Sequence, residues 1–460
     1  MPDAVTGTQG SLRARHTSML AIGGIIGAGL FVGSGSVIHS AGALAVAAYA
    51  IGGIILLLMM RMLAEMAAVR PTLGSFSEYA RLAFGRWAGF SIGWTYWYFW
   101  IVVVAFEAVA GAEIISHVVP SVPLWIISAV IMAVMTAVNL LSVRAFGEAE
   151  FWFASIKVIA IIVFLALGVL GLLDLLPSQQ IHGIALRTDS IAPSGLAGLL
   201  SALVVVVFSY FGAEIVTIAA AEAENPVQTV VRASKAVVWR VIIFYVGTIS
   251  LIVLLLPWKD TPSDASPFVA LLQKLGIPGA SVAMQAIILV SVLSVLNAGI
   301  YTSSRMLCAL TAQGEAPRMF SKRTRRGTPA RAILLATLVG WLAVGMAYVA
   351  PDTVFSFLLN AAGSVALVIY FVIAASQLRL RRVLDRAGEH LPVRMWAYPY
   401  LTWVTLLLLS GIVATMLALP ATRSQLVIGL IAPVAFVVVY FIRGALRMVR
   451  GRASDLLPLK

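Results

Sequence analysis

The stretch Ile22-Gly23-Gly24-Ile25-Ile26-Gly27-Ala28-Gly29-Leu30-Phe31 lies inside the first long apolar segment of the chain and decides how that segment folds. Each Gly disfavours a regular helix by about 1 kcal/mol relative to Ala. Small residues also let apolar helices pack closely, so the glycines alone fit either a broken helix or a tightly packed one. The choice between the two depends on whether a second interruption exists elsewhere in the chain.

A second interruption occurs in the sixth apolar segment, which reads Val207-Phe208-Ser209-Tyr210-Phe211-Gly212-Ala213-Glu214. Gly212 and the ionisable Glu214 lie near the middle of this segment. Interruptions in the first and sixth segments are what two inverted five-helix repeats produce. Unwound backbone inside a membrane is tolerated only where it is buried in protein or lines a cavity. The pair therefore predicts a ligand site between the two broken helices.

The composition places these segments in a membrane. The chain has 460 residues, of which 61% are hydrophobic and 11% charged, and its mean hydropathy is +1.00. Soluble domains carry about 45–50% apolar and about 25% charged residues. We therefore expect one membrane-embedded unit without a soluble enzyme domain. The single Cys308 can form no internal disulfide.

Twelve segments have about the 20 apolar residues that a membrane-spanning helix requires. They are residues 17–38, 41–62, 88–118, 124–143, 153–173, 196–219, 237–257, 281–311, 331–349, 353–376, 400–418 and 425–444. With a cytoplasmic N-terminus, this topology puts all but four of the 32 Lys and Arg residues on the cytoplasmic side or in the helix ends that adjoin it; the four are Arg187, Lys259, Lys274 and Arg423. Basic residues concentrate on that side of membrane proteins.

The net charge of +13 is thus explained by topology, and no nucleic-acid partner is expected. The densest basic cluster, in residues 318–331, either anchors the topology or binds anionic membrane lipids.

Several motifs, in order along the chain, resemble the bacterial amino-acid permeases of the APC superfamily. They are Arg15-His16 with Ala21 through Phe31, Ala64-Glu65-Met66, Pro71 through Tyr79, Gly93 through Trp97, Ala221 through Pro226, and Ser303 through Leu307. The resemblance implies an all-α, LeuT-type fold with a transport core over 17–376. Its two inverted repeats would cover about 17–173 and 196–376, followed by two helices in 400–444. The tails 1–16 and 445–460 would be cytoplasmic.

The same resemblance implies proton-coupled uptake of an amino acid across the bacterial inner membrane, with no cofactor and no metal. Residues 212–222 look most like the 4-aminobutyrate (GABA) permease branch. The implied substrate is GABA or another small neutral amino acid, although related branches carry aromatic or branched-chain amino acids. The oligomeric state is left open, as is the choice between symport and exchange.

The broken helices supply the expected substrate-binding groups. Amides at a half-helix beginning near Ala28 suit a carboxylate, because a helix N-terminus favours negative charge. Unpaired carbonyl groups around Ile22, Gly23, Phe208 and Phe211 suit an ammonium group. The expected substrate-binding residues are Ile22, Gly23, Ile25, Gly27, Ala28, Gly29, Phe208, Ser209, Phe211, Gly212 and Asn297.

Lys157 lies in the fifth apolar segment, where a charge costs at least about 2.5–3.5 kcal/mol and needs a function. It resembles the lysine that, in proton-coupled members of this fold, takes roughly the place of a sodium ion. Its ammonium is expected to bridge carbonyls near Gly23 to Ser294 or Asn297 on the eighth helix. The alternative is a lysine whose head group reaches the cytoplasmic interface.

Two acidic residues and one aromatic residue complete the expected coupling and gating set. Glu107, deep in the third segment, is either a proton carrier, a partner of the substrate amine or a structural hydrogen-bond acceptor. Glu214 either supports the sixth-helix break or approaches the substrate amine. Tyr210 flanks that break and is expected to act as a gate. Asn297 is expected to face the centre, where an interhelical hydrogen bond is the alternative.

Other classes of function fit the sequence less well. No carboxylate dyad, metal-ligand cluster or phosphate-binding loop is recognisable, and the five His residues are dispersed. A channel should present a continuous polar pore, which the mostly apolar segments do not predict. A membrane amino-acid sensor is the alternative from a different class, and an amino-acid exchanger is the alternative among transporters.

Overall fold

The computed structural model describes Met19, Leu358 and residues 26–72, 74–116, 118–176, 192–220, 225–261, 266–325, 327–350 and 364–455. All regular secondary structure in these ranges is helical. Nine helices in this part of the chain are long and apolar enough to cross a membrane. The all-α membrane fold is thus confirmed, whereas the count of twelve spans stays a prediction because parts of the first and tenth expected spans lie outside these ranges.

The first half of the chain contains the first expected interruption and four of the long helices. Its helices are α2 (Ala28–Phe31), α3 (Gly33–Ala41), α4 (Leu44–Val69), α5 (Phe76–Phe84), α6 (Arg86–Ser116), α7 (Leu124–Leu141) and α8 (Val143–Leu172). Two of them are longer than the predicted apolar segments: α4 continues beyond residue 62, and α8 begins ten residues before residue 153. The extension of α8 brings an additional buried carboxylate, Glu150, into the helix.

The second half contains the second interruption and the C-terminal helices. Its α-helices are α9 (Gly195–Ser209), α10 (Ile215–Ala220), α11 (Pro226–Arg240), α12 (Thr248–Leu255), α13 (Pro267–Lys274), α14 (Ala280–Ala312), α15 (Ala330–Val349), α17 (Val365–Arg386), α18 (Tyr400–Ala418) and α19 (Pro420–Asp455). A π-helical segment, Val241–Gly247, joins α11 to α12. Pro226 and Pro267 open their helices, where a missing N–H costs nothing.

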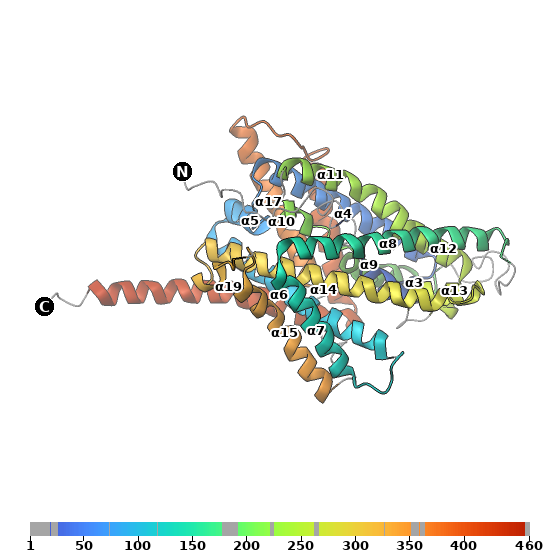
Figure 1. Ribbon diagram of the computed structural model, residues 1–460. Coiled ribbons are helices and arrows are strands. Elements are labelled where there is room, and N and C mark those ends of the chain that lie inside the picture. The colour runs from blue at the N-terminus through green and yellow to red at the C-terminus, as the bar shows by residue number, and fades with distance from the viewer. Residues whose placement is uncertain are drawn as a thin grey trace.

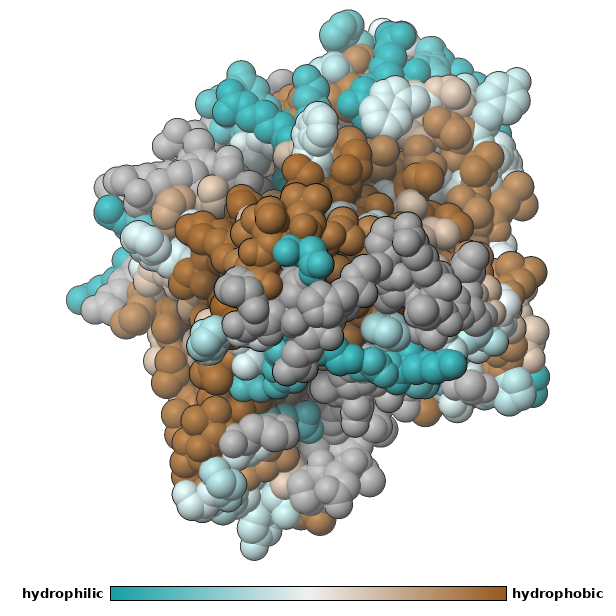
Figure 2. Space-filling model, turned by 90° about the vertical axis from the view of Figure 1, so that its right-hand side faces the viewer, coloured by the Kyte–Doolittle hydropathy of each residue, from teal (hydrophilic) through white to brown (hydrophobic). Residues whose placement is uncertain are grey.

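The long helices form a bundle around α6 and α14. Figure 1 shows α8 and α14 side by side through the molecule, and α14 also packs extensively against α6. On the face in Figure 2, hydrophobic residues form broad areas, with hydrophilic residues gathered mainly toward the upper edge. Exposed apolar residues such as Ile159 on α8 and Phe441 on α19 present hydrocarbon outward. These outer faces fit a lipid environment, and the polar groups described next lie inside the bundle.

Both expected helix interruptions are present. In the first helix, Gly27 is extended and precedes the start of α2 at Ala28. In the sixth, α9 ends at Ser209, a turn covers residues 210–214, and α10 begins at Ile215. Gly212 has a φ of 115° within this turn. Residues with a Cβ rarely adopt this conformation, so glycine is required for this path of the backbone.

Candidate functional site

The two interruptions lie against each other in the bundle interior. A Cβ built on Gly29 would lie 2.8 Å from Ser209 Cα, so the backbones of α2 and α9 are in direct contact. A Cβ on Gly27 would lie 2.7 Å from Val295 Cγ2 on α14 and 3.8 Å from Glu107 Oε1 on α6. The fold thus brings together the expected site residues Gly27, Ala28, Gly29 and Ser209, with Glu107 beside them.

Three of the expected substrate-binding residues, Ile22, Gly23 and Ile25, lie outside the described residues. The adjoining turn is described from Ile26 onward. The first amides of a helix have no acceptor within it. Here the N–H groups of Leu30 and Phe31 bond to the Gly27 carbonyl, at 3.2 and 3.3 Å. The amides of Ala28 and Gly29, which precede them, are therefore the groups of this turn available to an anionic ligand.

Glu214 holds the sixth-helix break in place. Its Oε2 accepts a hydrogen bond from the Gly212 amide at 2.9 Å, and its Oε1 accepts one from the Tyr96 hydroxyl on α6 at 3.1 Å. Thr217 Oγ1 donates to the Glu214 carbonyl at 2.6 Å. Because both carboxylate oxygens bond to protein donors, this arrangement favours support of the break over contact with a substrate amine, the two roles expected for Glu214.

The aromatic side chains next to the sixth-helix break face different neighbouring helices. Tyr210 donates to the Tyr49 carbonyl on α4 at 2.9 Å and is fully buried there, so in this conformation it anchors the end of α9 to α4. Phe211 packs instead on α6, with its ring centroid 4.3 Å from that of Phe99. Phe208 is half-buried and also approaches Phe99, at 6.4 Å. Phe208 and Phe211, rather than Tyr210, are thus the aromatic residues that share one surface.

Lys157 connects α8 to the first break. Its Nζ donates a hydrogen bond of 2.8 Å to the carbonyl oxygen of Ile26, and its side chain is fully buried. The burial excludes the alternative in which the head group reaches the cytoplasmic interface. The unwound backbone just before α2 is therefore bonded to a cationic group of a different helix.

The eighth-helix residues expected beside Lys157 bond to a residue that the sequence analysis did not single out. Ser294 Oγ donates to Glu150 Oε1 at 2.6 Å, and Asn297 Nδ2 approaches Glu150 Oε2 at 3.4 Å. The Asn297 side chain also accepts a bond of 2.8 Å from Asn139 on α7. Asn297 thus forms interhelical hydrogen bonds, the alternative considered for it, within a polar cluster joining α7, α8 and α14.

Glu150 was missed because it precedes the apolar segment 153–173 and looked like part of a cytoplasmic connection. The helix begins at Val143, so Glu150 lies two turns inside it and is almost fully buried. One signal was available: Glu150 and Lys157 are seven residues apart, which puts them on one face of a helix.

Glu107 completes the group of buried charges around the first break. It is 4% exposed, and within the described part of the chain its Oε2 has no hydrogen-bond partner. Both Glu107 and Glu150 interact electrostatically with Lys157. Two carboxylates and one ammonium are therefore buried together beside Gly27, where the chain is unwound.

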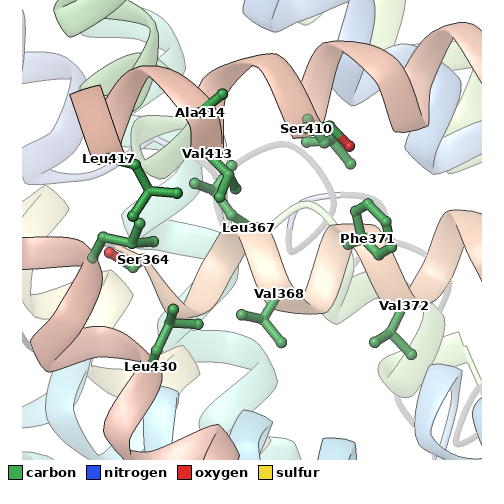
Figure 3. A pocket seen from close by; sticks show the side chains of 12 residues that line it. Ser364, Leu367, Val368, Phe371, Val372, Ser410, Val413, Ala414, Leu417 and Leu430 are labelled. Carbon is green, nitrogen blue, oxygen red and sulfur yellow. The ribbon is translucent and has the colours of Figure 1, made fainter. Parts of the chain in front are cut away.

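A separate apolar cavity of about 400 Å³ lies between α17, α18 and α19. Figure 3 shows Leu367, Phe371 and Val413 among its lining residues, and all twelve are apolar apart from Ser364 and Ser410. The side chains of Phe371 and Leu417 are exposed at this place. This cavity offers no charged group and none of the residues of the two breaks, so it is unsuited to a zwitterion.

The chain is similar to known proteins over nearly its whole length. The family model described as "Amino acid permease" matches residues 16–456. A gamma-aminobutyric acid permease of Bacillus subtilis is 47% identical over 431 residues, covering 93% of this chain and 92% of the relative. A gamma-aminobutyric acid permease of Escherichia coli is 44% identical, covering 91% of this chain and 90% of the relative. An aromatic amino acid transport protein of Corynebacterium glutamicum is 42% identical, covering 93% of this chain and 95% of the relative.

Proposed function

Because the chain belongs to the amino acid permease family, we propose that it imports GABA or another small neutral amino acid together with a proton. It is a multi-pass membrane transporter and not an enzyme. The observation that carries the coupling part of the proposal is the hydrogen bond from Lys157 to Ile26 at the first break. It connects a buried ionisable group directly to the backbone that would meet the substrate.

The substrate would bind between the two interrupted helices. Its carboxylate would face the amides of Ala28 and Gly29, and its ammonium would face carbonyl groups left unpaired by the breaks. Phe208 and Phe211 would cover the carbon chain, because they share the surface next to α6. Binding would then close the outer side, and rearrangement of the bundle would open the inner side.

Proton coupling requires that the two transport conformations bind the proton with different affinity. Glu107 and Lys157 are suited to this role because both lie at the first break, and a movement of that segment changes their surroundings. A Lys157→Ala variant is expected to lose gradient-driven accumulation. Full accumulation by this variant would contradict a coupling role for the lysine.

The remaining features of the proposal concern the membrane. The concentration of Lys and Arg in alternate connections supports a bacterial inner-membrane location with both termini in the cytoplasm. The transport core would comprise residues 17–376, with helices 11 and 12 in 400–444. Lipid hydrocarbon would cover the exposed apolar faces, including the cavity bordered by Phe371 and Leu417.

The test is uptake of radiolabelled GABA into proteoliposomes, with an imposed inward proton gradient compared with counterflow in its absence. Gradient-driven accumulation supports symport, whereas counterflow without accumulation indicates an exchanger. A competition panel of β-alanine, alanine, leucine and phenylalanine identifies the substrate class. Strong competition by phenylalanine would favour aromatic amino acids, which the similarity to the Corynebacterium glutamicum protein makes the second candidate. Absence of all transport would contradict the proposal and favour a sensor.

A further inference from the structure

The charges around the first break do not balance. Glu107 on α6 and Glu150 and Lys157 on α8 are all buried, and each carboxylate interacts with the ammonium. The side chains bonded to Glu150 are the uncharged Ser294 and Asn297 of α14, and Asn297 in turn accepts from the uncharged Asn139 of α7. With all three ionisable groups charged, one negative charge is left uncompensated. Because an uncompensated charge is costly in a buried site, the cluster favours uptake of one proton.

The hydrogen bonds show which carboxylate is built to stay charged. Glu150 accepts from Ser294 at 2.6 Å, and the Asn297 amide lies 3.4 Å from its second oxygen. Asn297 is itself held by Asn139. Donors of this kind favour the charged form of a carboxylate. Glu107 Oε2 lacks a hydrogen-bond partner among the described residues, so at Glu107 the charge of Lys157 favours the charged form without the donors that Glu150 has.

We propose that Glu150 is the fixed counter-ion of Lys157 and that Glu107 is the group that binds and releases the transported proton. This assignment rests on the proposed proton-coupled transport and specifies its site. Lys157 remains an ammonium throughout and donates to the Ile26 carbonyl. The Glu107 carboxylate takes a proton from water on the outer side, which makes the cluster neutral, and returns it to water on the inner side. One proton is carried in each cycle.

The test uses the charge count. Glu150→Gln leaves Glu107 and Lys157 as a balanced pair, so Glu107 no longer needs a proton, and gradient-driven accumulation should be lost. The double variant Glu150→Gln with Lys157→Gln leaves Glu107 alone, which again is neutral only with one proton bound. It should therefore regain accumulation that Glu150→Gln alone has lost. Glu148→Gln, the same chemical change on the same helix at a half-buried position, is the matched control and should accumulate like wild type.

Two results would overturn the assignment. Accumulation by Glu150→Gln at the wild-type level would show that Glu150 is not needed as a counter-ion. A double variant that performs counterflow without accumulation would show that Lys157 itself carries the proton. Failure of the wild-type protein to accumulate any amino acid is a different outcome, because it would refute the proposed symport and not the charge assignment.

A second measurement decides the assignment independently of transport. Infrared spectroscopy of the purified protein should show the band of a protonated carboxyl group that appears as the pH is lowered. The band should be missing in Glu107→Gln and present in the Glu150→Gln, Lys157→Gln double variant. A band that persists in Glu107→Gln and disappears in Glu150→Gln would place the proton on Glu150 and overturn the proposal.

Discussion

Replacing Gly29 by Ala is expected to weaken the contact between the two interrupted helices. The new Cβ would lie 2.8 Å from Ser209 Cα, and ordinary contact begins at 3.4 Å, so the backbones of α2 and α9 must separate by about 0.6 Å. Adding a methyl group to a packed interior costs about 1–3 kcal/mol, whereas Ala in place of a helical Gly contributes about 0.5–1 kcal/mol. The net loss of stability is therefore between about 0 and about 2.5 kcal/mol, with a middle value of about 1 kcal/mol.

Gly411 provides the matched control. It lies within α18 and is exposed, and a Cβ there would meet nothing within 4 Å. Gly411→Ala should therefore only gain the stability that Ala gives a helix relative to Gly. Thermal unfolding of both variants in the same detergent should give a midpoint below wild type for Gly29→Ala and one at or above wild type for Gly411→Ala, with counterflow reduced only in the former. Equal midpoints and wild-type counterflow for both would refute the contact between α2 and α9.

Two further predictions concern buried carboxylates. Arg381→Ala removes the cation bonded at 2.5 Å to Glu65, which is 1% exposed. It should cost about 3–5 kcal/mol of stability because a buried ion pair loses one partner. Arg381→Lys should lower the unfolding midpoint less, and a wild-type midpoint for Arg381→Ala would contradict the pairing. Glu214→Gln keeps an acceptor oxygen for the Gly212 amide and turns its NH2 group toward the Tyr96 hydroxyl, which must then accept. Both bonds lose the carboxylate charge, so the change should cost about 1 kcal/mol with slower counterflow. Tyr96→Phe leaves the buried Glu214 Oε1 without its donor, so it should cost about 1–3 kcal/mol and slow counterflow more than Glu214→Gln; wild-type midpoints and counterflow for both variants would show that Glu214 does not support the break.

The helix interruptions were predictable because their signal is local. A run of glycines before Ala28 and a Gly followed by an ionisable residue at 212–214 are visible without any partner. Both produce breaks where expected, and the second requires glycine because of its positive φ. The family resemblance was predictable for the same reason, since several short motifs keep their order along the chain, and the comparisons confirm it.

The partners of the buried polar groups were not predictable in this way. The sequence suggested that Ser294 and Asn297 face Lys157. Both residues bond to Glu150, and the hydropathy of the chain did not indicate that Glu150 lies inside α8. Tyr210 is a second residue whose hydrogen-bond partner the sequence did not indicate. Its place beside the break suggested a gate, whereas its hydroxyl bonds to the Tyr49 carbonyl, 161 residues away in sequence. Such contacts depend on how helices rotate about their axes, which a segment's composition does not specify.

The bonds of Lys157 and Glu150 give the proposed proton coupling a physical route to a large rearrangement. The two residues fix α8 at two levels: Lys157 holds the first break, and Glu150 holds α14. A hydrogen bond involving a charged group contributes about 1.5–3 kcal/mol, and each 1.4 kcal/mol changes a population ratio about tenfold. Loss of the single bond to Ile26 would thus shift the balance of two conformations by roughly one to two orders of magnitude. A change of charge at Glu107, beside Gly27, acts on the same segment and therefore needs no long pathway to reach the helix proposed to bind the substrate.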